Sequence, residues 1–270
     1  MKKILCPTDF SDAADQAIAY AAKLCRKIDA ELTLLNVQSV FSLPMEEVIK
    51  GKYLATEPIL NRLEEQSYQV MEVFKISCRS DVQASNSTLS DVITQRAKDF
   101  DLIVMGTNGP DDYDEFFFGS QSYQVAKESI IPVLLIPSGC GYQDISTLAF
   151  AFDYEHEQEF SIKQLINFAN LLNAKINIVQ VKEHYNREVE VNSKAVEERT
   201  KMLYNLSDIE FDTVFSDETS RRISTYVLET KADALALCSI NHSIITKLFH
   251  TSVIKALSAN SSYPIFIFHN

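Results

Sequence analysis

A strand that runs directly into a glycine-rich loop is the stretch of this chain best suited to hold a ligand. The apolar run Leu102–Met105 is too short for a helix and is typical of a strand buried on both faces. Gly106 and Gly109 follow it, and glycines can adopt positive φ angles and leave no Cβ in the way of a ligand. Gly119 and Ser120 then open a helix, where unpaired N–H groups and the helix dipole favour an anion such as phosphate. The hydroxyl of Ser120 either adds a donor to that anion or caps the helix.

The local pattern alone leaves two interpretations of these glycines open. They form either a phosphate-binding loop or an ordinary turn after the strand. The spacing matches neither the G-x-G-x-x-G of dinucleotide folds nor a Walker A loop, because no Lys follows Gly119. It resembles instead the G-x2-G-x9-G-[S/T] nucleotide signature of the universal stress protein family. That resemblance implies ATP or AMP bound at this loop. It implies nucleotide contacts at Pro7, Thr8, Asp9, Val37, Met105, Gly106, Gly109, Gly119, Ser120 and Gln121.

Asp9 follows a short first strand, Lys2–Thr8, and therefore lies at the carboxyl end where open parallel sheets bind ligands. The resemblance implies that its carboxylate contacts the nucleotide. The alternative is an Asx turn that introduces the next helix, which Ser11 is expected to cap. Val37, near the end of the second strand, has the same two interpretations: a backbone contact to adenine, as the resemblance implies, or plain core.

An acidic stretch lies between Gly109 and Gly119 and departs from a simple phosphate loop. Residues 111–115 carry four carboxylates, which would repel a triphosphate unless they hold Mg²⁺, a cation that favours carboxylate and phosphate oxygens together. A solvated acidic loop is the favoured interpretation. The aromatic run Phe116–Phe118 is expected to pack under the loop or against the other half of the chain.

The order of apolar patterns predicts alternating strands and helices in the first half. We expect the following elements: strands at 2–8, 31–37, 78–83, 101–105 and 132–137, and helices from Ser11, over 44–76 with a break near Pro58, from Thr88 and over 120–129. Thr88 and Asp91 resemble a capping box. This order predicts a doubly wound, mainly parallel α/β sheet with right-handed crossovers, and the family resemblance implies the Rossmann-like strand order 3-2-1-4-5.

The second half repeats the first. It has a strand at 147–152 that ends at Asp153, in the place of Asp9, and a strand at 175–181. Further strands are expected at 209–215 and 234–238, and helices from Ile162, near 191–204 and at 220–230. Gly106 to Gly119 and Cys238 to Thr251 span the same number of positions. We therefore expect two tandem domains, 1–140 and 141–270, with Gly139–Gly141 as the linker.

The second copy lacks the glycines. Cys238, Asn241 and Thr251 stand where Gly106, Gly109 and Gly119 stand, while Ser252 matches Ser120. Side chains at all three places would crowd a phosphate, so we expect no nucleotide at this loop. His242 and His250 flank it, but no carboxylate or thiol lies at ligand spacing to make a metal site with them.

Composition limits the classes of function. The chain has 270 residues, is 46% hydrophobic and carries a formal charge of −12 without a basic cluster, which disfavours nucleic acid. No apolar stretch is long enough to span a bilayer and no signal peptide is evident, so the cytoplasm is the expected location. The five cysteines are scattered and never in C-x-x-C spacing, which indicates neither a disulfide framework nor a zinc site.

The preferred interpretation is a stress-response protein whose first domain binds an adenine nucleotide in a regulatory role, since no nucleophile, base and orienter set is recognisable. A nucleotide-free scaffold or interaction module is the main alternative. A hydrolase or kinase-like enzyme that uses Ser120 or the acidic loop is a third. The family resemblance also implies that the two copies pair through their last strands as a pseudo-dimer, with further pairing between chains open.

Overall fold

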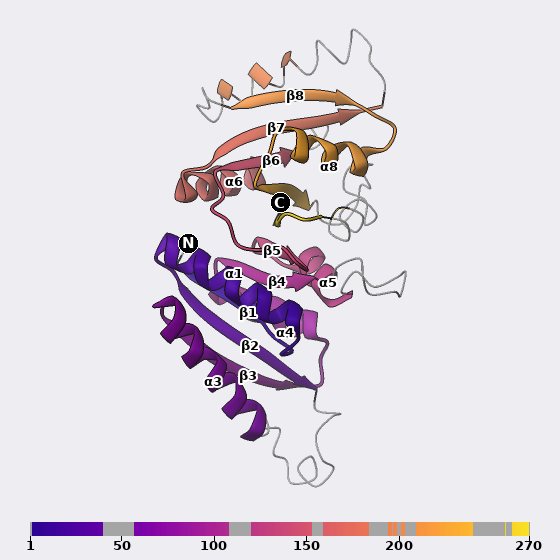
Figure 1. The fold of residues 1–270 in the computed structure, drawn as a ribbon. Helices are drawn as coiled ribbons and strands as arrows, with labels where there is room; N and C mark the ends of the chain where they lie inside the picture. The colour runs from indigo at the N-terminus through magenta and orange to yellow at the C-terminus, as the bar shows by residue number, and fades with distance from the viewer. Residues whose placement is uncertain are drawn as a thin grey trace. The chain divides into compact units, whose positions relative to one another are not determined.

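The structure is a computed structural model that describes residues 2–39, 57–107, 120–152, 159–183, 194–195, 197–198, 201–202, 209–239, 257 and 261–269. The chain divides into two compact units, Met1–Tyr142 and Gln143–Asn270. Among the described residues no helix is both long and apolar enough to cross a membrane. Each unit is a parallel α/β sheet and is described by itself (Figure 1).

The first unit alternates strands and helices as expected. Its elements are β1 (Lys3–Pro7), α1 (Asp12–Ile28), β2 (Glu31–Ser39), α3 (Glu57–Phe74), β3 (Cys78–Ser85), α4 (Leu89–Arg96), a 3₁₀ turn η2 (Ala97–Asp99), β4 (Leu102–Thr107), α5 (Ser120–Glu128) and β5 (Val133–Pro137). The strands lie in the order β3-β2-β1-β4-β5, and all described pairings are parallel. The predicted doubly wound fold and its strand order are confirmed.

The second unit has the same topology. Its elements are β6 (Thr147–Ala151), α6 (Glu159–Leu172), β7 (Lys175–Lys182), β8 (Glu210–Phe215), α8 (Thr219–Glu229), β9 (Ala234–Ser239) and β10 (Ile265–His269). The order β10-β9-β6-β7-β8 mirrors that of the first unit, again with parallel pairings. The helix expected near 191–204 is described only at 194–195, 197–198 and 201–202, which are helical.

Local sequence explains where the helices of the first unit begin. The Ser11 hydroxyl accepts the Ala14 N–H and caps α1, as expected. Thr88 and Asp91 form the predicted capping box before α4. The helix expected over 44–76 is described from Glu57 onward, with Pro58 in the first turn of α3, and residues 44–56, on the other side of the expected break, lie outside the described residues. Proline fits that turn because its missing N–H would have no partner inside the helix.

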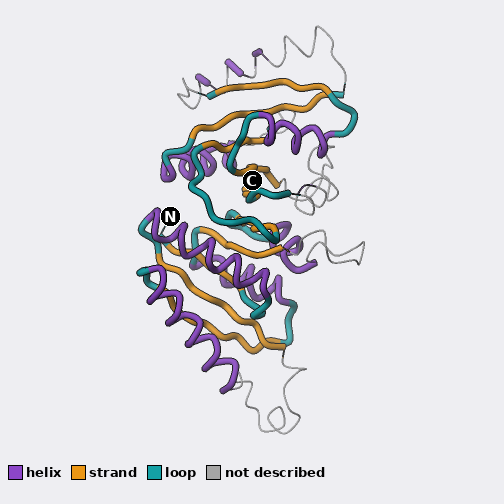
Figure 2. Tube along the Cα trace, in the orientation of Figure 1, coloured by secondary structure: helices purple, strands orange, loops and turns teal. Residues whose placement is uncertain are grey.

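The core of each unit consists of strands that are buried on both faces. Ile4, Leu5, Ile103 and Val104 in the first unit are fully shielded, as are the aliphatic residues of β9 in the second. Helices α1 and α3 pack against each other, and α4 packs against α5. Figure 2 shows α1 and α3 in front of the strands of the first unit, so buried strands are covered by amphipathic helices.

Both units close the amino ends of their central strands with an aspartate. Asp101, just before β4, accepts the backbone N–H groups of Lys2 at 2.7 Å and Lys3 at 3.0 Å. Asp233, just before β9, accepts those of Ser146 at 2.8 Å and Thr147 at 2.9 Å. The repeat inferred from sequence therefore extends to individual hydrogen bonds.

Candidate functional site

The carboxyl ends of β1 and β4 are neighbours and form the switch point of the first sheet. From β1 the chain winds outward through β2 to β3, and it then crosses back to β4 on the other side of β1. Such a point leaves a crevice outside the strand ends, where open α/β sheets bind ligands. Asp9 follows β1 and Gly106 lies in β4, so the fold brings these two predicted residues to the same edge of the sheet, where such a crevice is expected.

Gly106 is required by close packing. A Cβ on this residue would lie 2.6 Å from the carbonyl carbon of Ala13 in the first turn of α1, which no real side chain tolerates. Its φ is not in the left-handed region, so the positive φ that we considered for it is absent. The space left by the missing side chain is filled by α1. Glycine at 106 therefore allows the N-terminal end of α1 to approach the end of β4.

The loop between β1 and α1 is a tight turn built from its own side chains. The Asp9 carboxylate oxygen Oδ1 accepts the Ser11 N–H at 3.0 Å and the Ser11 hydroxyl at 2.5 Å. The Thr8 hydroxyl accepts the Phe10 N–H at 3.0 Å. The Asx-turn interpretation of Asp9 is thus what the structure contains. Asp9 is exposed, and among the described residues its second oxygen, Oδ2, has no hydrogen-bond partner, so it remains available to a ligand.

The neighbouring strand fixes the same turn from the other side. Thr8 donates its N–H to the Leu35 carbonyl at 2.8 Å, and the Asn36 amide donates to the Thr8 carbonyl at 2.8 Å. Asn36 and Thr8 are both buried. Sequence reasoning missed Asn36, although a polar residue inside an apolar strand was a visible signal. Val37 follows in β2 and is half-buried, which is compatible with either interpretation given for it.

The far side of the crevice is held by α5. The Ser122 hydroxyl donates to the Gly106 carbonyl at 2.8 Å, and Ser122 is itself buried. Met105 is buried within β4, and Gln121 is exposed on α5. Ser120 is the first residue of α5, as expected for the residue after the loop. The start of α5 is thereby tied to the end of β4.

Several predicted features fall outside the described residues. They are Gly109, Gly119, the acidic residues 111–115, Phe116–Phe118, Asp153, Asn241, His242, His250, Thr251 and Ser252. Of the nucleotide contacts implied by the resemblance, the structure brings Pro7, Thr8, Asp9, Met105 and Gly106 to one edge of the sheet. Val37 reaches that edge on β2.

Two side chains on helices near this edge were not anticipated. Gln16, on α1, donates to the Cys140 carbonyl at 2.7 Å and accepts the Gly139 N–H at 3.0 Å, which ties the expected linker to α1. Arg62, on α3, lies with its guanidinium carbon 4.1 Å from the centre of the Phe10 ring. Neither residue stood out in the sequence, because both contacts join positions far apart in the chain.

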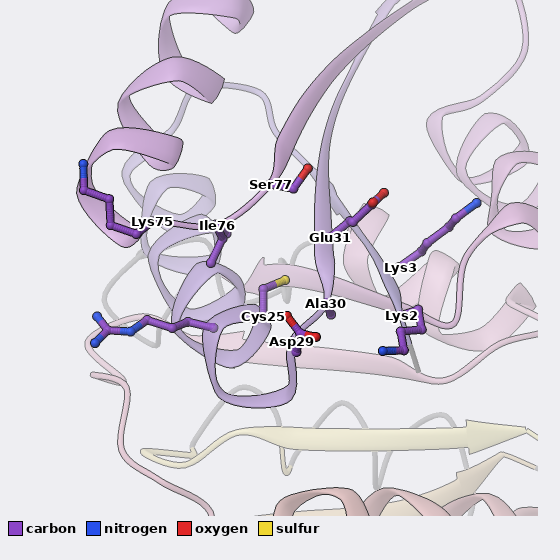
Figure 3. A pocket seen from close by; sticks show the side chains of 10 residues that line it. Lys2, Lys3, Cys25, Asp29, Ala30, Glu31, Lys75, Ile76 and Ser77 are labelled. Carbon is purple, nitrogen blue, oxygen red and sulfur yellow. The ribbon is translucent and has the colours of Figure 1, made fainter.

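The opposite, amino-end edge of the first unit contains a cavity of about 480 Å³, shown in Figure 3. Its lining includes the cations Lys2, Lys3, Arg26 and Lys75, together with Asp29 and Glu31. The amine ends of Lys3 and Lys75 extend to opposite sides of the view instead of converging. Lys75 also pairs with Glu72 at 3.3 Å, and Glu31 with Arg79 at 3.6 Å. The C-terminal ends of α1 and α3 lie here, so Arg26 and Lys75 are placed to offset the helix dipoles.

The cysteines have the structural role expected from their spacing. All five, Cys6, Cys25, Cys78, Cys140 and Cys238, are buried and unbridged. Burial raises the pKa of the Cys25 and Cys78 thiols to about 12 and also raises the pKa of Cys6 and Cys140. Thiols protonated at neutral pH are poor nucleophiles, so these residues act as small apolar groups. Among the described residues no cluster of His, Cys, Asp and Glu is arranged to hold a metal.

Comparison with known proteins identifies the family. The universal stress protein family model matches residues 1–137, about half of the chain. The chain belongs to the universal stress protein family. A universal stress protein of Thermus aquaticus is 31% identical over 139 residues, a match that covers 50% of this chain and 98% of the relative. Universal stress protein MJ0531 of Methanocaldococcus jannaschii is 29% identical over 144 residues, covering 50% of this chain and 81% of the relative.

A solved structure extends the likeness of the fold to the whole chain. The crystal structure of a universal stress protein from Archaeoglobus fulgidus superposes with a TM-score of 0.78 and covers 99% of this chain and 98% of its own. Its identity is 17%, so this likeness concerns the fold alone. The fold of the whole chain, both units included, is therefore found in a solved universal stress protein.

Proposed function

We propose that the first unit binds an adenine nucleotide, ATP or AMP, at the crevice between β1 and β4 and that binding regulates the protein. The observation that carries the proposal is the position of Asp9, which is exposed and whose Oδ2 atom has no hydrogen-bond partner among the described residues, at the carboxyl end of β1 beside β4. This is the switch point of the sheet, and the N-terminal end of α1 lies against the end of β4 there. The positive end of the α1 dipole then faces the same crevice as Asp9.

In this proposal the residues at the strand ends have separate tasks. The Oδ2 atom of Asp9 accepts from a ribose hydroxyl, while its Oδ1 atom keeps the turn closed. The backbone at Val37 contacts adenine. The backbone N–H groups of the glycine-rich loop and of the start of α5 hold the phosphates, and Mg²⁺ accompanies a triphosphate.

The proposed role is regulatory because the described residues offer no catalytic set. The thiols near the crevice are buried and protonated, and Asp9 is engaged in its own turn. A nucleotide-free scaffold is the alternative, and it is favoured by one observation: the space at Gly106 is occupied by α1, so this glycine has a structural reason to exist without a ligand. Pairing of the two units as a pseudo-dimer, pairing between chains and a cytoplasmic location remain predictions.

Calorimetric titration of nucleotide-free protein with ATP and with AMP, each with and without Mg²⁺, tests the proposal. Saturable 1:1 binding is expected. If both nucleotides give only the heat of dilution into buffer, the nucleotide proposal is wrong and the scaffold alternative is supported. Asp9→Asn keeps an oxygen for the Asx turn but removes the charge, so about tenfold weaker binding is expected with an unchanged melting temperature. Asp29→Asn is the matched control, because Asp29 lies in the left-handed C-cap of α1 at the opposite edge, where asparagine is tolerated.

A further inference from the structure

The Lys and Arg residues of the first unit are distributed unevenly between the two edges of its sheet. Apart from Arg62, every described one lies at the start of a strand, in the C-terminal half of a helix, or just after a helix. These residues are Lys2, Lys3, Lys23, Arg26, Lys27, Lys75, Arg79, Arg96, Lys98 and Lys127. In a parallel α/β sheet these positions surround the amino-end edge, away from the proposed nucleotide crevice.

Carboxylates lie at both edges, and three of them are close together in sequence at the carboxyl end of β1. Asp9, Asp12 and Asp15 lie in the turn after β1 and the first turn of α1. A bound phosphate there would meet several negative charges in a chain whose formal charge is −12. Arg62 lies in the N-terminal half of α3, and it is the single described cation of the first unit placed to compensate them.

The contacts of Arg62 leave its donors available. The guanidinium lies over the Phe10 ring, with its carbon 4.1 Å from the ring centre, and the side chain is exposed. Among the described residues Arg62 has no ion pair, whereas Arg79 has one and Arg96 has two. Stacking uses one face of the guanidinium plane, while its N–H donors lie along the edges. A stacked arginine of this kind presents a preorganised fork to an anion.

The residue beneath Arg62 is itself held in an uncommon conformation. Phe10 has φ of 64°, in the left-handed region that bulky residues rarely adopt, and it is not at a helix C-terminus like the other described non-glycine residues with positive φ. The Thr8 hydroxyl bond to the Phe10 N–H maintains this turn. Gln66, one turn after Arg62, donates to Asp15 at 2.7 Å and fixes α3 against α1. The position of Arg62 over the Phe10 ring is therefore set by both helices.

We propose that Arg62, stacked on Phe10, is a phosphate contact of the first unit and provides its affinity for phosphorylated over unphosphorylated adenosine. This inference rests on the proposed function and assigns a residue to the anionic part of the ligand. Arg62 donates N–H groups to phosphate oxygens from the α3 side of the crevice.

Titrations with ATP, AMP and adenosine on four forms of the full chain test this inference. The forms are the unmodified protein, Arg62→Gln, Arg62→Lys and the control Arg79→Gln, which removes an exposed arginine at the opposite edge. We expect Arg62→Gln to weaken ATP and AMP about tenfold and to leave adenosine within about twofold. Arg62→Lys is expected to bind ATP and AMP more tightly than Arg62→Gln but more weakly than the unmodified protein. Arg79→Gln is expected to bind all three ligands like the unmodified protein.

The outcomes separate the two proposals. If the unmodified chain binds adenylates but Arg62→Gln keeps the same affinity for ATP and AMP, the assignment of Arg62 is wrong and the proposed function stands. Equal weakening of adenosine and of the phosphorylated ligands also overturns the assignment, because the contact would then be to the nucleoside. Binding of none of the three by the unmodified chain overturns the proposed function and this inference with it. Melting temperatures of all forms are expected to agree, since both arginines are exposed.

Discussion

The two units keep the same bonds at one edge of their sheets and differ at the other. At the amino-end edge, Asp101 and Asp233 make the same pair of backbone hydrogen bonds. Helices α1 and α6 both end in a left-handed residue, Asp29 with φ of 54° and Asn173 with φ of 56°. At the carboxyl-end edge, Gly106 in the first unit corresponds to Cys238 in the second, which is fully buried. The features that hold the fold are duplicated, while the close approach of a helix to the central strand is found in the first unit.

A second difference concerns how a helix is tied to the outer strand. In the first unit Arg96 of α4 forms an ion pair with Asp81 of β3, with a distance of 3.1 Å from Nε to Oδ2. In the second unit the equivalent positions are Tyr226 of α8 and Asp212 of β8, whose hydrogen bond is 2.6 Å long. The aspartate is retained and its partner has changed from a cation to a phenol. The same tie is therefore made by charge in one unit and by a neutral donor in the other.

The largest effect is expected from placing the residue of the second unit into the first. Gly106→Cys introduces a Cβ against the Ala13 carbonyl, so α1 must shift, at a cost of about 1–3 kcal/mol in the free energy of unfolding. Hydrogen exchange measured by mass spectrometry is expected to increase in peptides from residues 11–28. Nucleotide binding, where present, is expected to fall with it.

Cys238→Ala is the matched change in the second unit. It removes only a buried sulfur, so we expect a loss of about 1 kcal/mol and unchanged exchange in α1. Unaltered exchange in residues 11–28 of Gly106→Cys would show that the first turn of α1 does not depend on glycine. The difference between Gly106 in the first unit and Cys238 in the second would then have no effect on the packing of the helix.

A smaller effect is expected from the duplicated aspartates. Asp101→Asn and Asp233→Asn each weaken two backbone hydrogen bonds to a charged acceptor and should each destabilise by about 1–2 kcal/mol. Partial burial acts to raise the pKa of Asp101, but the N–H groups of Lys2 and Lys3 and the nearby positive charges outweigh it and lower the pKa. The stabilisation is therefore present above the unfolded-state pKa of about 3.9 and is lost as pH falls through the lower folded value.

Urea unfolding between pH 2 and 7 measures this loss. The stability difference between the unmodified chain and Asp101→Asn should shrink only below about pH 4. A difference that already disappears near pH 6, or one much larger in one unit than in the other, would contradict the equivalence of the two amino-end edges.

The smallest effect is expected from the ties to the outer strands. Tyr226→Phe loses one hydrogen bond, about 1 kcal/mol, and Arg96→Gln loses a partly exposed ion pair, at most about 1 kcal/mol. Added salt should weaken the second contribution and leave the first unchanged. Burial, reinforced by Asp212, raises the pKa of Tyr226. Its stabilisation is thus complete below the unfolded-state pKa of about 10 and is lost as pH rises above that value.

Unfolding of both variants at low and high salt, and of Tyr226→Phe from pH 8 to 11, distinguishes the two ties. An equal salt response in the two variants would mean that both ties are electrostatic. If Tyr226→Phe still loses stability between pH 8 and 11, groups other than Tyr226 cause that loss.

The features predictable from sequence were those set by neighbours along the chain. The Thr88–Asp91 capping box, the Ser11 cap and the alternation of buried strands with amphipathic helices depend on residues within a few positions. The strand order came from a family resemblance and was confirmed. Pro58 lies in the first turn of α3, where proline is tolerated, and the residues before Glu57 lie outside the described part of the chain.

The candidate site was predictable as a set of positions and not as a set of contacts. Asp9 and Gly106 were identified, but the reason for glycine at 106 is a carbonyl that lies 93 positions away in the sequence, at Ala13. Arg62 carried no local signal, because its partner Phe10 is brought to it by the packing of α3 on α1. Contacts of this kind depend on the tertiary arrangement, which periodicity does not encode.

The contact at Gly106 also bears on how such proteins diverge. A substitution there is opposed by the body of the protein itself, whatever happens in the crevice, since a methyl group would collide with a neighbouring main chain. A descendant of the first unit that stopped using nucleotide but kept α1 at this distance would still be under selection to keep this glycine, whereas the second unit has Cys238 at the corresponding position. Gly106, the first glycine of the signature, is therefore weaker evidence for a functional ligand site than Gly109 and Gly119.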